Sequence, residues 1–440
     1  MKRKSISLLL FSLLVLVLSS CGGRRTLLFL NWGEYIDESL LVEFENKYNC
    51  NVLMDLGESN EIFYSKLKAG TTVYDVITPS DYMVEKMYKN DLLEKLDFSK
   101  LENYNPKSED VRYGIGKIDE NMRQNTDDDI TNYYVPYLWG TWGIMYTTEK
   151  EGLEKAVTGN QNQWASLFDR NALPAKTRVA MYDSHQHAYY AACRYLGLDV
   201  YAEQPTSKLQ EIRDLVSNMN YNAWGTDTIK KDIVAGNIDV GFMWTGDFLY
   251  FFCENAAKTV MDAYLANDVT NEDFADMLDT ITSAERVYKT QNGSEYQIGF
   301  DLFIPDDTIA FCDNLVITKD SANKDLAYKF IDFMCAKEVD EVTPALSNTY
   351  YVCYDTPFNS VYEEILALSD IEYDLDTVNE LKGDFSDPYD GDLYWSFYDY
   401  AISKAFERFY PKDSQKGSIL ASFSRQYIKQ INTAFNNARA

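Results

Sequence analysis

Apolar strand-like segments and amphipathic helices alternate along the first hundred residues, and this alternation predicts an α/β sheet. The first strand begins at Thr26 and leads into a helix in which Leu40, Phe44 and Tyr48 recur every four residues. Two further strand–helix pairs follow before residue 90. We therefore expect residues 26–100 to form one β-α-β-α-β-α half-domain.

A second α/β unit is predicted further along the chain. Strand-like segments recur at residues 178–182, 238–244 and 309–318, and helical patterns lie between them. A long extended segment at residues 134–143 has the character of a crossing between two lobes. We expect two crossings of this kind, one near residue 137 and one near residue 311.

The crossings divide the chain into two discontinuous lobes. We expect one lobe from residues 21–136 and 312–356, and the other from residues 137–311 and 357–440. Residues 255–305 lack clear strand signals and predict a helical insertion in the second lobe. A chain of this length usually divides into domains, and two lobes joined by several strands can close on a ligand like jaws.

The N-terminus carries the pattern of an export signal. Residues 2–4 are basic, and the apolar stretch at residues 6–18 is shorter than the roughly 20 residues of a spanning helix. Leu18-Ser19-Ser20-Cys21 then resembles the lipobox of bacterial lipoproteins. We expect removal of residues 1–20 and acylation of Cys21, which anchors the protein outside the cell membrane. A plain secretory signal or an uncleaved anchor is the alternative.

The net charge disfavours two classes of partner. Without residues 1–20 the chain has 38 basic and 69 acidic residues, a net charge of −31. Such a chain repels nucleic acid and anionic lipid headgroups. Six cysteines remain besides Cys21, and no two of them form a C-x-x-C pair. Buried free thiols are therefore favoured over a disulfide framework, although an exported protein can also form a disulfide bridge.

Signals of catalysis are weak. The chain has no G-x-S-x-G motif, and Gly114-Ile115-Gly116-Lys117 lacks the first glycine and the final Ser or Thr of a phosphate loop. The only histidines, His185 and His187, lie close to Asp183 and suggest a metal site. A helix beginning near residue 185 and capped by Ser184 or Asp183 explains the same segment without metal. We expect no enzyme activity, no metal and no cofactor.

Aromatic and acidic residues recur together where predicted strands begin or end. Glu34, Asp81, Asp247 and Asp313 all lie next to aromatic residues in such places. In open α/β sheets, ligands bind beyond the carboxyl ends of the strands. An aromatic face attracts an ammonium group by roughly 0.5–2 kcal/mol, and a charged hydrogen bond adds roughly 1.5–3 kcal/mol. The pattern is typical of a site for small cations, although such rings also seal core edges.

These segments resemble the spermidine/putrescine-binding proteins of polyamine ABC transporters. The resemblance is carried in order by Asn31-Trp32-Gly33-Glu34-Tyr35-Ile36, Glu58-Ser59-Asn60-Glu61, Tyr74-Asp75-Val76-Ile77-Thr78-Pro79-Ser80 and Val135-Pro136-Tyr137-Leu138-Trp139-Gly140. It is continuous over residues 27–147 and resumes at 236–246 and 311–334. It implies a two-lobed periplasmic-binding-protein fold, acting as a monomer, that delivers a polyamine to a membrane permease driven by a separate ATPase.

The resemblance also implies a set of ligand contacts. Asp313 matches the acid that holds an ammonium group, Trp244 matches a ring that stacks on the methylene chain, and Phe311 replaces a tryptophan. The other positions implied as contacts are Trp32, Glu34, Tyr35, Ser80, Tyr82, Thr226 and Tyr351. These assignments predict a cleft between the lobes that binds the amine from both sides.

One end of the implied site departs from the family. The two carboxylates that grip the far end of the polyamine fall on Ser184 and His187 here, and only Asp183 nearby can substitute. The far end of the ligand is therefore expected to be neutral or even a carboxylate. We favour putrescine over spermidine, with another amine or an amino-acid-like solute as the alternative. A secreted metal-dependent enzyme and a sensor or adhesin lipoprotein are the alternatives from other classes.

Overall fold

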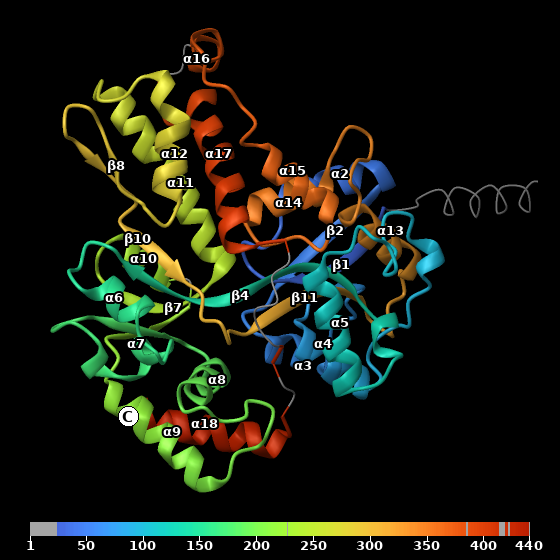
Figure 1. Ribbon diagram of the computed structural model, residues 1–440. Helices are drawn as coiled ribbons and strands as arrows, with labels where there is room; N and C mark the ends of the chain where they lie inside the picture. The colour runs from blue at the N-terminus through green and yellow to red at the C-terminus, as the bar shows by residue number, and fades with distance from the viewer. Residues whose placement is uncertain (1–23, 227, 384–385, 413–418, 421–422, 440) are drawn as a thin grey trace, which may run out of the picture.

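The computed structural model describes residues 24–439 apart from 227, 384–385, 413–418 and 421–422, so the predicted lipid anchor at Cys21 lies outside the described residues. Within them, one mixed sheet runs through the whole molecule (Figure 1). Its strand order is β2-β1-β3-β11-β4-β7-β5-β6, and β10 pairs with β4. The bounds are β1 (Arg25–Asn31), β2 (Cys50–Leu56), β3 (Val76–Ile77), β4 (Val135–Thr147), β5 (Val179–Tyr182), β6 (Ala223–Gly225), β7 (Val240–Trp244), β10 (Phe300–Phe303) and β11 (Ala310–Ile317).

The first lobe is built on β1, β2 and β3, as the alternation of strands and helices predicts. These strands pair in parallel, and α2 (Glu38–Tyr48), α3 (Asn60–Ala69), α4 (Asp81–Lys89), α5 (Tyr113–Asn125) and α13 (Lys324–Met334) surround them. Polar caps fix where these helices begin. Asp37 accepts a hydrogen bond from the backbone of Ser39 at 3.0 Å, and Ser59 accepts one from Ile62 at 3.2 Å.

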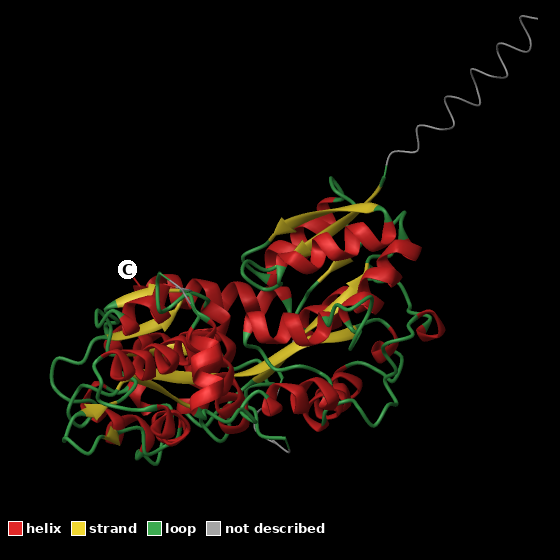
Figure 2. Ribbon diagram, turned by 90° about the horizontal axis from the view of Figure 1, so that it is seen from above, coloured by secondary structure: helices red, strands yellow, loops and turns green. Residues whose placement is uncertain are grey.

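Two long strands carry the chain between the lobes, where the sequence predicts crossings. β4 and β11 are antiparallel neighbours, with Asp313 opposite Leu138 and a bulge between Asp313 and Asn314. β11 also pairs with β3 of the first lobe, whereas β4 also pairs with β7 of the second. Figure 2 shows the two lobes side by side with these strands between them. The sheet is therefore continuous from one lobe to the other through β4 and β11.

The second lobe is built on β5, β6, β7 and β10. α8 (His185–Tyr195), α9 (Thr206–Met219) and α18 (Arg425–Arg439) pack together at one end of the molecule (Figure 1). α11 (Thr245–Leu265), α12 (Phe274–Thr282) and α17 (Asp392–Phe409) form a helical layer at the other. The remaining helices are α6 (Leu153–Thr158), α7 (Ala165–Phe168), α10 (Thr228–Val234), α14 (Pro344–Val352), α15 (Asn359–Ala367) and α16 (Leu375–Lys382).

The stretch expected to be a helical insertion is not purely helical. Residues 255–305 begin in the middle of α11, continue through α12 and reach β10, which joins the main sheet. A short hairpin of β8 (Tyr288–Lys289) and β9 (Glu295–Tyr296) lies between them. The six described cysteines are buried with free thiols, and no helix in the described part of the chain is long and apolar enough to cross a membrane.

Candidate functional site

A buried carboxylate lies where the two lobes meet. Asp313 is only 5% exposed, at the bulge in β11. The Tyr35 hydroxyl donates to its Oδ2 at 2.8 Å, and the Ser80 hydroxyl donates to its Oδ1 at 2.5 Å. Burial raises the pKa of Asp313 to about 6, and the two hydroxyl donors oppose that rise. Each oxygen keeps a second lone pair, so the group can still accept from a cation.

Local structure brings these hydroxyls to Asp313. Tyr35 lies in the loop after β1, in which Glu34 adopts a left-handed backbone conformation with φ of 53°. Ser80 precedes α4 and is held by Asn60, whose amide donates to the Ser80 hydroxyl at 2.9 Å and accepts from its backbone at 3.0 Å. The resemblance motifs around residues 31, 60 and 80 therefore meet at one place in the fold.

A second buried carboxylate lies close to the first; the aromatic–acidic pattern in the sequence includes it, whereas the contacts implied by the resemblance do not. Asp81 is fully buried and accepts a hydrogen bond from the backbone of Cys312 at 3.0 Å. Burial raises its pKa to about 8, and the charge of Asp313 adds to the rise. The sequence feature that points to Asp81 is its position next to Ser80, after the end of a predicted strand.

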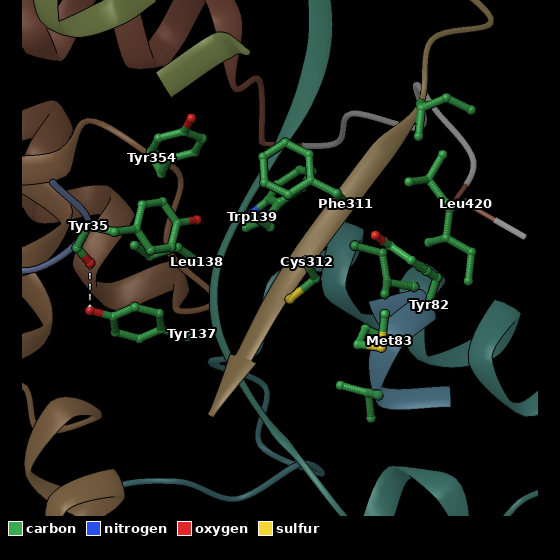
Figure 3. Packing of buried hydrophobic residues seen from close by; sticks show 14 of the residues in the cluster. Tyr35, Tyr82, Met83, Tyr137, Leu138, Trp139, Phe311, Cys312, Tyr354 and Leu420 are labelled. Atoms are coloured by element: carbon green, nitrogen blue, oxygen red, sulfur yellow. Dashed lines mark hydrogen bonds between the residues drawn. The ribbon is translucent and has the colours of Figure 1, made fainter. Parts of the chain in front are cut away.

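Aromatic rings form a continuous row from Asp313 toward the second lobe. Tyr35 contacts Tyr354 at 5.1 Å between centroids, Tyr354 contacts Phe311 at 5.9 Å, and Phe311 contacts Trp244 at 4.6 Å. Figure 3 shows Tyr35, Tyr354 and Phe311 gathered beside β11. Tyr354 was not among the expected contacts. Tyr351, which was, lies on α14 with 54% of its surface exposed.

The other expected first-lobe residues differ in their surroundings. Trp32 is half-buried, stacks on Phe63 at 4.4 Å and donates to the carbonyl of Thr78 at 2.8 Å. Tyr82 is buried at the start of α4, and Figure 3 shows it beside Leu420 of the C-terminal segment. Glu34 is exposed. Burial raises the pKa of Tyr250 on α11, and Glu34 is among the charges that add to the rise.

The far end of the site is formed by the start of α8. Ser184 caps this helix, and its hydroxyl lies 2.5 Å from Nδ1 of His187. The His187 ring contacts Trp142 at 5.0 Å and Trp244 at 5.2 Å. Burial lowers the pKa of His187 to about 3, so the ring is neutral at physiological pH. Asp183 and Thr226 are exposed at the same edge of the sheet.

One more acidic residue acts on Tyr354, but it is already paired. Asp247 in the first turn of α11 forms a 2.9 Å ion pair with Lys230, which is buried on α10. Burial raises the pKa of Tyr354 well above its ordinary value, and Asp247 is the largest of the charges that add to this rise. The aromatic–acidic pattern after β7 pointed to Asp247, but its pairing with Lys230 has no sequence signal.

The two histidines do not face each other. His185 stacks on Phe435 of α18 at 5.8 Å, whereas His187 points into the aromatic row. Among the residues that the structure describes, no group of three His, Cys, Asp or Glu side chains could hold a metal ion.

Comparisons with known proteins support the resemblance noted in the sequence. A family described as hypothetical lipoprotein (MG045 family) matches residues 1–180. The spermidine/putrescine-binding periplasmic protein of Salmonella typhimurium is 27% identical over 351 residues, covering 78% of this chain and 83% of the relative. The putrescine/cadaverine-binding protein of Pseudomonas aeruginosa is 28% identical over 333 residues, covering 74% and 79%.

Solved structures agree with the fold. A putative spermidine/putrescine ABC transporter from Listeria monocytogenes superposes with a TM-score of 0.62 at 25% identity, covering 94% of this chain and 99% of that one. A spermidine/putrescine substrate-binding protein from Streptococcus pneumoniae gives 0.59 at 23% identity, covering 94% and 98%. The predicted two-lobed binding-protein fold is confirmed. The chain is similar in sequence to spermidine/putrescine-binding periplasmic proteins and similar in fold to a putative spermidine/putrescine ABC transporter.

Proposed function

We propose that this protein captures a polyamine, putrescine or spermidine, between its lobes and delivers it to the permease of an ABC importer. The observation that carries the proposal is Asp313, a buried carboxylate that accepts from two hydroxyl donors and lies beside a row of aromatic rings. The names of the relatives, which bind spermidine, putrescine or cadaverine, support the same class of ligand.

The chemistry of this site fits an alkyl ammonium ligand. An ammonium group has three donors and no acceptor, and the free lone pairs of Asp313 and the exposed Glu34 are acceptors. The rings of Trp244, Phe311 and Tyr354 offer faces for methylene groups and attract the cation by roughly 0.5–2 kcal/mol each. A charged hydrogen bond adds roughly 1.5–3 kcal/mol. Together these terms are of the size that a micromolar site requires, roughly 8 kcal/mol.

Ligand binding would favour the closed arrangement of the lobes. Tyr35 and Ser80 belong to the first lobe, Trp244 belongs to the second, and Asp313 lies on the strand that joins them. A ligand that contacts all of them is bound best when the lobes are together, and this differential affinity shifts the population toward closure. We propose the lobe boundaries given by the sequence, with crossings near residues 137 and 311.

The remaining partners follow from the same proposal. Acylation at Cys21 would hold the protein on the outer face of the cell membrane, close to its permease, and the match to a lipoprotein family over residues 1–180 supports this placement. The ATPase that drives import would be a separate subunit. We propose that the protein acts as a monomer with no catalytic activity of its own.

Calorimetric titration of the purified protein with putrescine, spermidine, cadaverine, agmatine and lysine tests the proposal. We expect at least one diamine or polyamine to bind with micromolar or tighter affinity and lysine to bind more weakly. Heat of binding from lysine alone, or from none of the five, would refute it.

A further inference from the structure

The end of the cleft around His187 differs in chemistry from the end around Asp313. The row of rings that starts at Tyr35 continues through Phe311 and Trp244 to His187, and Phe311 lies two residues before Asp313 on the same face of β11. The ring contacts therefore connect the two ends without a break.

The ring–ring contacts of His187 with described residues are made by uncharged aromatic side chains. His187 is enclosed by Trp142, Tyr182 and Trp244, at 5.0, 5.4 and 5.2 Å between ring centroids. Burial lowers the pKa of the ring, so His187 is neutral at physiological pH. Asp183, which follows β5, is exposed.

Two buried side-chain donors in this part of the protein have no hydrogen-bond acceptor among the described residues. The indole Nε1 of Trp142 is buried and finds no hydrogen-bond partner among the described residues. The side-chain nitrogen of Gln186, next to His187 in the first turn of α8, is also buried and also has no partner there. A buried donor without an acceptor costs roughly 1–3 kcal/mol, which a ligand carbonyl could recover. An ammonium group, which only donates, could not.

We propose that His187 makes the far end of the cleft a neutral, hydrogen-bonding subsite, so that the preferred ligand is an amine with one ammonium end and one uncharged, acceptor-bearing end. A mono-N-acetylated diamine has this chemistry: its ammonium group binds Asp313, and its amide lies among the rings around His187. The inference rests on the proposed function, because it takes the Asp313 end as the ammonium site.

The test compares three ligands of similar length by calorimetric titration: N-acetylputrescine, putrescine and 4-aminobutyrate. We expect the purified protein to bind N-acetylputrescine at least fivefold more tightly than putrescine. Tighter binding of putrescine would overturn the inference and leave the proposed function standing. Tightest binding of 4-aminobutyrate would also overturn it, since the far end would then select an anion. Failure of all three to bind would overturn the inference as well, and the titrations with spermidine, cadaverine and agmatine would then decide separately whether the proposed function stands.

Substitutions assign the preference to His187. His187→Glu introduces a carboxylate, and we expect it to reverse the preference so that putrescine binds more tightly than N-acetylputrescine. His187→Gln keeps a neutral hydrogen-bonding group and should retain the wild-type order of affinities. His185→Gln is the matched control, because His185 packs on α18 and should leave the order unchanged. Each result is a ratio measured in one variant, so partial loss of folded protein does not alter it. An unchanged ratio in His187→Glu would contradict the assignment.

Discussion

The Tyr35 hydroxyl donates to Asp313 across 2.8 Å and joins the loop after the first strand to a strand nearly 280 residues later. This contact places an aromatic ring and a buried carboxylate together at the junction of the lobes. Because Asp313 is buried, its ionisation is costly, and the site is therefore sensitive to pH.

Amine affinity should fall as the pH is lowered through about 6. The pKa of Asp313 is raised to about 6, and only its ionised form attracts an ammonium group. At pH 5 about one tenth of Asp313 is ionised, so we expect putrescine to bind about tenfold more weakly than at pH 7.5. Calorimetric titration across this range measures the effect. A constant affinity between pH 7.5 and 5 would contradict the role of Asp313.

The stability of the ligand-free protein should show the opposite trend. A carboxyl group whose pKa is raised on folding stabilises the fold below its ordinary pKa near 4, and this stabilisation is lost as the pH rises through about 6. Asp313→Asn has no carboxyl group to titrate at this position. We therefore expect the free energy of unfolding of the variant to fall less between pH 4 and pH 7 than that of the wild type. Urea denaturation at both pH values measures it. An identical pH dependence in the two proteins would show that Asp313 is not buried as described.

Tyr354 and Tyr351 offer a matched pair of substitutions. Tyr354 lies in the aromatic row, whereas Tyr351 is exposed on α14. We expect Tyr354→Ala to weaken putrescine binding by about tenfold, on the order of one lost aromatic contact with a cation and its methylene chain. Tyr351→Ala should change the affinity by less than about twofold. A larger loss of affinity in Tyr351→Ala than in Tyr354→Ala would show that Tyr351 contacts the ligand, as the resemblance implies.

Gly246 should tolerate no side chain. A Cβ atom there would lie 2.3 Å from the Tyr354 ring, so the ring would have to move. We expect Gly246→Ala to lower the free energy of unfolding by about 1–3 kcal/mol and to weaken putrescine binding. Gly116→Ala is the control, because a Cβ atom at this helical position meets nothing within 4 Å. Equal stability of both variants in urea denaturation would contradict the packing of Tyr354.

The ion pair of Arg112 and Asp355 should be essential for stability. Both side chains are buried, with 3.1 Å between Nη2 and Oδ2, and Asp355 bridges to Trp139 on β4. We expect Arg112→Met to cost about 3–5 kcal/mol of unfolding free energy, because it leaves a buried carboxylate without its partner. Adding Asp355→Asn should recover part of this loss, and no recovery in the double variant would argue against the pairing.

The order of strands and helices was predictable because each signal is local. Asp37 and Ser59 cap helices within three residues, and periodic apolar positions mark the buried faces. Local patterns cannot give contacts that depend on packing. Tyr354 enters the aromatic row after Cys353 ends α14 in a left-handed conformation, and Lys230 neutralises Asp247 from another helix. The burial of Asp81 likewise depends on β11, which lies far away in the sequence.

Titration of the wild-type protein and Asp313→Asn with putrescine at pH 7.5 compares the buried carboxylate with an isosteric amide. Asp320→Asn, at an exposed position beyond β11, is the control for an equal loss of charge. We predict that Asp313→Asn loses at least tenfold in affinity, about the contribution of one charged hydrogen bond, while Asp320→Asn binds as the wild type does. Equal affinities in all three proteins would contradict an amine site at Asp313.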